Sequence, residues 1–207
     1  TAIRQASSVG SIMGPNIAYE VAQDKYAEDI VALTSHSDSI IAAKAFSTPN
    51  FIVSPSDDVV GVEIGAALKN IVALAAGFCD GMNLGANTKA IVMARGFQEI
   101  YRAAASLGAW SDSFIKESAI LGDVLTTCIS PDSRNRTTGE HLGRGLSVPE
   151  ALKLLKGRVC AGLETIQICR MFEKSNVKLP IMTALCDLSE GKIDRYECLA
   201  HILRKNP

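Results

Sequence analysis

The chain has 207 residues, of which 47% are hydrophobic, and its formal net charge at pH 7 is −1. This composition is typical of a globular protein with one large domain or two small ones, and it gives no support for a nucleic-acid partner. Aromatic residues make up only 5% of the chain, which also disfavours stacking platforms for bases.

Membranes, metals and disulfides are not expected either. The longest apolar stretch is interrupted by Lys69, and no signal peptide is visible at Thr1. The three histidines are isolated from one another, so no metal site is predicted. None of the six cysteines belongs to a C-x-x-C pair: Cys79, Cys128, Cys160, Cys169, Cys186 and Cys198. Six reduced thiols in a cytoplasmic protein are therefore predicted.

Residues 1–58 alternate between short strands and helices. Helices are predicted over 17–23 and 37–46, and strands over 29–33 and 51–53. Such alternation predicts a parallel or mixed sheet flanked by helices. Because so few short strands make a poor independent sheet, we interpret this stretch as the end of an α/β domain whose beginning precedes Thr1.

From residue 57 onward no strand is predicted. Helices are expected over 57–79, about 87–107, 112–117, 120–128, 132–142, 146–155, 160–175, 179–189 and 194–204. The first of these has a predicted start at Ser54, which can cap it, with Pro55 in the first turn and Asp57 adding a carboxylate. The fold class predicted for the whole chain is α+β.

Small residues recur at every fourth position of the first long helix, and Lys69 interrupts them. Gly61, Gly65, Lys69, Ala73 and Gly77 lie along one stripe of that helix. Because the other residues of this stripe have almost no side chain, a ligand could approach it closely. Lys69 would then be a partly desolvated amine that could transfer a proton. Two simpler interpretations remain open: the glycines pack against another helix, or the lysine extends to water.

A second polar cluster follows in the segment GDVLTTCISPDSRNR. Asp123 and Thr127 are four residues apart, so they face the same side of a helix. Arg134 and Asn135 then offer a guanidinium and an amide, which suit a phosphate dianion. The alternative is that Asp123 caps a helix and the arginines are solvated.

Four segments together resemble the soluble NAD-dependent glycerol-3-phosphate dehydrogenases: 14–22, 60–90, 122–136 and 141–145. The resemblance implies that residues 1–58 are the C-terminal part of a Rossmann-type NAD-binding domain. Residues 59–207 would be an all-helical substrate and catalytic domain. It also implies NAD as cofactor, dihydroxyacetone phosphate and sn-glycerol 3-phosphate as substrates, and a homodimer.

The same resemblance assigns roles to individual residues. Lys69 would exchange a proton with the C2 oxygen of the substrate. The residues expected to bind substrate are Asn16, Asp123, Thr127, Arg134 and Asn135. Ala18 would touch NAD through its backbone, and Arg134 would also reach the cofactor.

The sequence departs from the family pattern in two places. No G-x-G-x-x-G fingerprint occurs, because the segment 143–145 lacks the third glycine and follows a predicted helix. Ala161 stands where the family usually has Glu or Gln before a glycine. A helical dimerisation or substrate-binding fragment without redox activity is therefore an alternative. A related dehydrogenase acting on another hydroxy acid is disfavoured by the Ser133–Asn135 motif.

Overall fold

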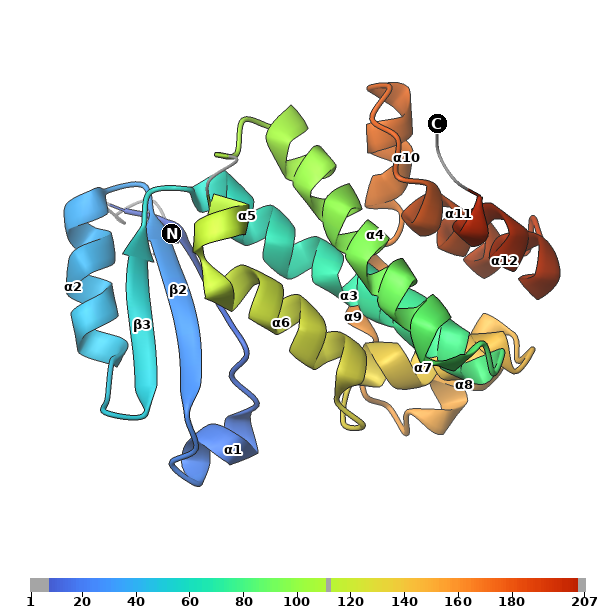
Figure 1. The fold of residues 1–207 in the computed structure, drawn as a ribbon, viewed down its shortest axis with the longest axis horizontal. Helices are drawn as coiled ribbons and strands as arrows, with labels where there is room; N and C mark the ends of the chain where they lie inside the picture. Colours follow the sequence, from blue (N-terminus) through green and yellow to red (C-terminus); the bar gives the residue numbers. More distant parts are fainter. Residues whose placement is uncertain (1–7, 111–112, 205–207) are drawn as a thin grey trace. The chain divides into compact units, whose positions relative to one another are not determined.

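The computed structural model describes residues 8–110 and 113–204, and the chain divides into two compact units (Figure 1). The first unit comprises residues 1–66 and 104–123, and the second comprises residues 67–103 and 124–207. The chain passes from one unit to the other within three helices: α3 (Val59–Gly81), α4 (Gly85–Ser106) and α6 (Ser118–Ile129). The predicted start of a helix at residue 112 lies outside the described residues.

The first unit contains a mixed three-stranded sheet in the order β1-β2-β3. Strand β1 (Gly10–Met13) is antiparallel to β2 (Ala27–Leu33), and β2 is parallel to β3 (Phe51–Ser56). Helix α2 (His36–Phe46) connects the two parallel strands and contacts both of them, while the shorter α1 (Ala18–Ala22) joins β1 to β2. A small core forms between sheet and helix from Val31, Ala43 and Val53. The prediction of a parallel or mixed sheet is confirmed.

The predicted helix start at Ser54 is wrong. Ser54 and Pro55 both lie in β3, where Pro55 pairs with a residue of β2. Proline is tolerated there because β3 is an edge strand in the described sheet. Asp58 caps α3 instead, accepting a hydrogen bond from the backbone N–H of Gly61 at 2.8 Å. Its other carboxylate oxygen accepts from the backbone N–H of Trp110 at 3.0 Å.

Helix α3 is the most apolar long helix of the described chain. By length and composition it could cross a membrane, with a mean hydropathy of 1.7 over its most apolar window. However, 56% of that window is buried within the structure, and Leu68, Ile71 and Leu74 are among its fully buried side chains. The core helix of a globular protein has this same composition. The hydropathy of α3 is therefore explained by packing.

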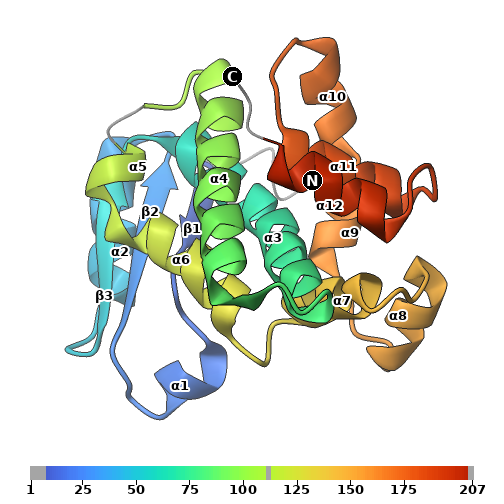
Figure 2. The same ribbon diagram turned by 45° about the vertical axis from the view of Figure 1, so that its right-hand side comes forward.

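The described residues of the second unit form helices joined by loops, with no strand among them (Figure 2). Its remaining helices are α7 (Arg134–Gly143), α8 (Val148–Leu154), α9 (Ala161–Thr165), α10 (Ile168–Lys174), α11 (Pro180–Ser189) and α12 (Arg195–Leu203), while α5 (Ser113–Lys116) belongs to the first unit. The helix predicted over 160–175 is in fact two. The hydroxyl of Thr165 donates to the carbonyl of Ala161 at 2.9 Å, a back-bond that favours a bend at this point. The predicted α+β class is confirmed.

A buried carboxylate joins α4 to α11. Glu99 is 1% exposed, and its two oxygens accept hydrogen bonds from the backbone N–H groups of Ile181 at 2.8 Å and Met182 at 3.1 Å. These are the first N–H groups of α11, which have no acceptor within their own helix. Burial raises the pKa of Glu99 to about 7, against the opposing effects of the two N–H donors and Arg102. Glu99 thus caps α11 at an electrostatic cost.

All six cysteines are free and buried. Burial raises the pKa of Cys79 to about 11 and the pKa of Cys169 to about 12. Because only the thiolate is a good nucleophile, these two thiols are poor candidates for catalysis. Their role in the fold is packing.

Candidate functional site

The predicted site residues are distributed over both units. The second unit contains Lys69, Thr127, Arg134 and Asn135. The first unit contains Asn16, Ala18 and Asp123. Within the described residues, no group of three or more His, Cys, Asp or Glu side chains could hold a metal ion.

The glycine stripe of α3 is a packing surface, as the simpler interpretation held. A Cβ atom on Gly77 would lie 1.8 Å from the backbone oxygen of Arg136, and one on Gly139 would lie 2.0 Å from the backbone oxygen of Leu74. Helices α3 and α7 are thus in direct backbone contact, which larger side chains would prevent. At Gly65 the nearest atom is the Sδ of Met13, at 3.2 Å. Lys69 is half-buried on the same helix.

Asn135 connects three parts of the second unit beside Lys69. Its Nδ2 donates to Oδ1 of Asn70 at 2.9 Å, so it reaches the residue that follows Lys69. Its Oδ1 accepts from the backbone N–H of Gly162 at 2.8 Å and from the thiol of Cys160 at 3.3 Å. The side chain is only 8% exposed. Helices α3, α7 and α9 therefore meet at one buried amide.

These contacts fix the orientation of both amides. The N–H of Gly162 can only donate, so the atom of Asn135 that faces it must be the carbonyl oxygen. The amino group of Asn135 then faces Asn70, whose own carbonyl oxygen must accept it. The amino group of Asn70 is consequently left on the opposite side of its amide. The direction of the Asn70 amide on α3, one residue from Lys69, is thereby fixed.

The two arginines of the SRNR motif differ in their surroundings. Arg134 is exposed at the first position of α7, immediately after the cap residue Ser133. Arg136 is mostly buried: its Nη1 donates to Glu140 at 3.3 Å. Its Nε lies 3.1 Å from Asp80 Oδ2, at ion-pair distance but without the alignment of a hydrogen bond. Of these two arginines, Arg134 is therefore the one with an exposed guanidinium at a helix N-terminus, where anions are favoured.

Asp123 and Thr127 lie one turn apart on α6, as their spacing predicted. Asp123 is 4% exposed and Thr127 is half-buried. Asp123 lies in the interior of α6 (Ser118–Ile129), five residues after its start, so it does not cap this helix. The alternative interpretation of Asp123 as the cap of the helix that contains it is therefore wrong.

In the first unit, Asn16 and Ala18 follow β1. Both residues are exposed, and Ala18 is the first residue of α1. The Nδ2 of Asn16 donates to Oδ2 of Asp29 on β2 at 2.6 Å. Asp29 itself is 2% exposed. Asp29 was not among the residues predicted from the sequence, although a charged residue inside a predicted strand was a visible signal.

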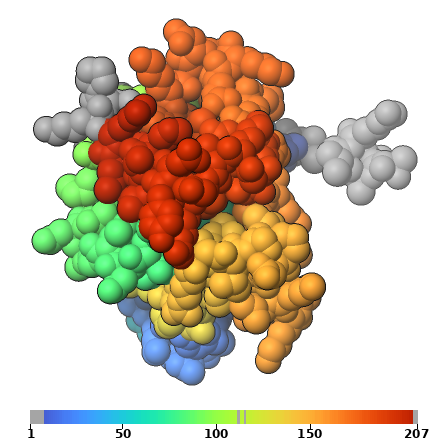
Figure 3. Space-filling view, turned by 90° about the vertical axis from the view of Figure 1, so that its right-hand side faces the viewer, coloured from blue at the N-terminus to red at the C-terminus, as the bar shows by residue number. Residues whose placement is uncertain are grey.

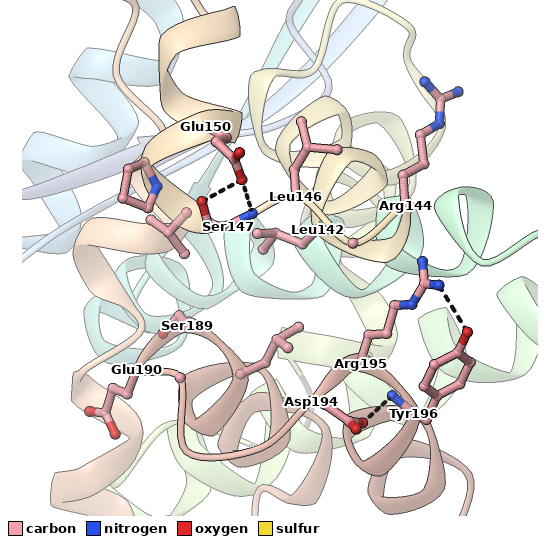
Figure 4. A pocket seen from close by; sticks show the side chains of 15 residues that line it. Leu142, Arg144, Leu146, Ser147, Glu150, Ser189, Glu190, Asp194, Arg195 and Tyr196 are labelled. Atoms are coloured by element: carbon pink, nitrogen blue, oxygen red, sulfur yellow. Dashed lines mark hydrogen bonds between the residues drawn. The ribbon is translucent and has the colours of Figure 1, made fainter.

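A separate pocket of about 730 Å³ lies in the second unit, between the segment around α8 and the last two helices. Figure 3 shows these two parts of the chain as the gold segment below the red one. Several polar side chains of this pocket bond to one another: Ser147 donates to Glu150, and Arg195 donates to Tyr196 (Figure 4). None of the predicted site residues lines it. Two capping residues lie in the lining: Ser147 is the N-cap residue of α8, and Asp194 is that of α12.

Comparison with known proteins decides the family. The family described as "NAD-dependent glycerol-3-phosphate dehydrogenase C-terminus" matches residues 58–200. The chain belongs to the NAD-dependent glycerol-3-phosphate dehydrogenase family. The match contains Lys69, Asp123, Thr127, Arg134 and Asn135. The resemblance inferred from the sequence motifs is confirmed.

Individual relatives agree with this membership. The chain is 39% identical over 204 residues to a glycerol-3-phosphate dehydrogenase [NAD(P)+] of Corynebacterium kroppenstedtii, covering 98% of this chain and 61% of that protein. It is 40% identical over 200 residues to one of Clostridium tetani, covering 94% of this chain and 56% of that protein. The chain therefore spans about three fifths of the length of the curated relatives it matches.

Solved structures show the same fold in the family. Glycerol-3-phosphate dehydrogenase from Coxiella burnetii superposes with a TM-score of 0.89 at 28% identity, covering 96% of this chain and 61% of that one. The enzyme from Saccharomyces cerevisiae gives a TM-score of 0.83 at 27% identity, and the match covers 94% of this chain and 59% of that one. The family fold thus extends through the described sheet as well as the helices.

Two residues of the site were not found from the sequence. Asn70 was visible only as the second polar break in an apolar helix, and nothing in its spacing indicated a contact with Asn135. Gly162 was noticed for its neighbour Ala161, which begins α9. A Cβ atom on Gly162 would lie 2.7 Å from the backbone oxygen of Asn70, so the glycine is needed for close approach.

Proposed function

We propose that the protein carrying this chain catalyses reversible, NAD(H)-dependent reduction of dihydroxyacetone phosphate to sn-glycerol 3-phosphate. The family match over residues 58–200, which includes Lys69 and the Arg134–Asn135 pair, is the observation that carries the proposal. In the forward direction a hydride is added to C2 of the ketone and a proton to the C2 oxygen. NADH supplies the hydride and becomes NAD.

Lys69 is proposed to hold and deliver that proton. As hydride reaches C2, negative charge develops on the C2 oxygen, and a positioned ammonium group stabilises this charge and then transfers a proton from Nζ. The half-buried position of Lys69 on α3 suits this role, because partial exclusion of water strengthens the interaction. In the reverse direction the neutral amine accepts the proton from the hydroxyl.

Arg134 is proposed to hold the substrate phosphate. Its exposed guanidinium can form two parallel hydrogen bonds to phosphate oxygens, and it stands at the N-terminus of α7. The side-chain amide of Asn135 is engaged within the protein, so its contribution to the phosphate would come through its backbone N–H and through orienting Asn70. Binding the remote phosphate orients the reacting carbon.

Asn16, Asp123 and Thr127 are proposed to orient the substrate and the lysine. For the cofactor, the exposed backbone at Ala18 and the exposed guanidinium of Arg134 fit contacts to a dinucleotide, whose phosphates attract a cation. The curated relatives are named as NAD(P)-dependent, and we propose NAD as the cofactor here. Residues 1–58 would then be the end of the NAD-binding domain, and residues 59–207 the substrate domain.

A cytoplasmic homodimer is proposed as the working form. Six free, buried thiols suit a reducing compartment, where disulfides do not persist. The dimer rests on the family resemblance and is tested by light scattering of the purified protein. A single species of monomer mass at micromolar concentration would contradict it.

The activity is tested on the native-length protein, whose length is set by intact-mass measurement. NADH absorbance is followed with dihydroxyacetone phosphate, with unphosphorylated dihydroxyacetone and with a 2-oxo acid. We expect NADH consumption with the phosphorylated ketone and little with the other two compounds. Turnover of the 2-oxo acid without turnover of dihydroxyacetone phosphate would overturn the proposal.

For the 207-residue chain by itself, coverage of about three fifths of its relatives favours a second candidate function. This is substrate binding and dimerisation without redox activity. The dinucleotide fingerprint is not among these residues, so the isolated chain should bind NADH weakly. Fluorescence titration with NADH measures this affinity. Micromolar binding by the isolated chain would contradict the second candidate.

A further inference from the structure

An exposed amide in the first unit is anchored to a buried carboxylate. Asn16 is exposed just after β1, and its Nδ2 donates to Oδ2 of Asp29 at 2.6 Å. Asp29 lies in the middle of β2 and is 2% exposed. Burying a carboxylate costs free energy that an apolar residue at this position would not cost. The carboxylate therefore calls for an explanation other than packing.

The backbone is shaped to make this contact. Strands β1 and β2 are antiparallel with Met13 opposite Ile30, so Gly14 comes to lie beside Asp29. A Cβ atom on Gly14 would be 2.2 Å from Oδ1 of Asp29 and 2.1 Å from the backbone oxygen of Glu28. Only glycine allows the segment to approach β2 this closely. Asn16, two residues later, is thereby brought within hydrogen-bond distance of the carboxylate.

The hydrogen bond between Asn16 and Asp29 determines which end of the Asn16 amide faces outward. A carboxylate accepts hydrogen bonds and cannot donate them, so the amino group of Asn16 must face Asp29. The amide oxygen of Asn16 then lies on the side away from the buried carboxylate. The exposed end of Asn16 is consequently a hydrogen-bond acceptor of fixed direction.

An acceptor at this position selects among the groups of the substrate. This step rests on the proposed function, in which Asn16 binds dihydroxyacetone phosphate. At neutral pH the phosphate is mostly a dianion and the C2 ketone is an acceptor, so the C1 hydroxyl is the donor that remains. We infer that Asp29 is a positioning residue, which orients Asn16 so that its amide oxygen accepts a hydrogen bond from the C1 hydroxyl of the substrate.

The test compares two ketones in the native-length protein. The second ketone is acetol phosphate, in which a methyl group replaces the C1 hydroxymethyl group. We measure kcat/KM for both with the wild type, Asp29→Asn, Asn16→Ala and the double variant. Asp29→Asn lets the amide of Asn16 turn over, so kcat/KM for dihydroxyacetone phosphate should fall roughly tenfold, while that for acetol phosphate should hardly change.

Two features separate positioning from a purely structural role. In the Asn16→Ala background, Asp29→Asn should cause no further loss, because Asp29 acts through Asn16. Glu28→Gln is the matched control on the same strand. Glu28 accepts from Ser118 and Tyr26, so this variant should leave the discrimination between the two ketones unchanged.

Equal losses on both ketones, or additive losses in the double variant, would overturn the inference. If Asp29→Asn fails to fold, Asn16→Ala still decides, because this surface variant must itself lose the discrimination between the ketones. Retained discrimination in Asn16→Ala would also overturn the inference. A wild-type protein that does not reduce dihydroxyacetone phosphate would instead refute the proposed function, so the two failures are distinguishable.

Discussion

Asn135 donates a hydrogen bond from its Nδ2 to Oδ1 of Asn70 over 2.9 Å, and this bond joins α7 to α3 one residue from Lys69. The opposite side of the same amide accepts the N–H of Gly162. Helix α7, which contains Arg134, and helix α3, which contains Lys69, are therefore coupled through one buried side chain. A change at Asn135 should affect both the stability of the second unit and the direction of Asn70.

Asn135→Ala should lower the free energy of unfolding by about 1–3 kcal/mol, because it leaves the buried N–H of Gly162 without its acceptor. Urea unfolding measures this loss. A double-mutant cycle with Asn70→Ala should give a coupling energy of about 0.5–3 kcal/mol, as expected for side chains in contact. Additive effects of the two substitutions would show that the bond between these amides contributes nothing.

Stability should depend on pH through Glu99. Its pKa is about 7 in the folded protein and 4.5 in the reference state, so the protonated form is favoured by folding. Its contribution is therefore greatest below pH 4.5, falls between pH 4.5 and 7, and is constant above. The total change should be about 3–4 kcal/mol at most, since the two pKa values differ by about 2.5 units and one unit corresponds to about 1.4 kcal/mol.

The comparison variant for this prediction is Glu99→Gln, which does not titrate. Unfolding free energies of the two proteins are measured in urea from pH 4.5 to 8. The difference between them isolates Glu99, because the other titrating groups are common to both. A difference that stays flat across this range would mean that Glu99 keeps its ordinary pKa in the fold.

Arg134→Lys should raise KM for dihydroxyacetone phosphate by roughly tenfold to a hundredfold, since a charge-assisted hydrogen bond contributes about 1.5–3 kcal/mol. Lysine keeps the charge but loses the planar fork that matches a phosphate. Any activity on unphosphorylated dihydroxyacetone should hardly change. Steady-state kinetics with both ketones checks this.

Arg136→Lys is the control for Arg134. It is two residues away on α7, but it is paired with Glu140 and Asp80 within the protein. Arg136→Lys should lower the free energy of unfolding and leave KM for dihydroxyacetone phosphate nearly unchanged. An equal loss of kcat/KM on both ketones in Arg134→Lys would place Arg134 at the cofactor or in the fold, and would contradict its role at the substrate phosphate.

Local patterns predicted most of the fold. The long apolar helix, the helical spacing of Asp123 and Thr127, and the alternation of short strands and helices in residues 1–58 all depend on neighbours in the chain, so they can be predicted from local sequence. The error at Ser54 and Pro55 has the same origin. Their types suit a helix start, but pairing with a strand more than twenty residues earlier keeps them in β3.

The contacts of the candidate site depend on long-range packing, which the sequence did not reveal. Asn135 meets Asn70 and Gly162 because glycines let α3 and α7 touch backbone to backbone. Asp29 meets Asn16 because Gly14 lets β1 and β2 converge. In both cases the glycines can be seen in the sequence, but the strand or helix that packs against each of them cannot. Spacing alone could not distinguish a packing glycine from one that lines a site.

The central claim is that Lys69 transfers the proton in the proposed reaction, and the most direct test is kcat of Lys69→Ala at saturating dihydroxyacetone phosphate and NADH. Lys153→Ala, an exposed lysine on α8, serves as the control. We predict that kcat of Lys69→Ala falls by roughly 10²–10⁴-fold, the usual contribution of a general acid, while the control keeps wild-type turnover. A folded Lys69→Ala protein that turns over at a near-normal rate would contradict the account.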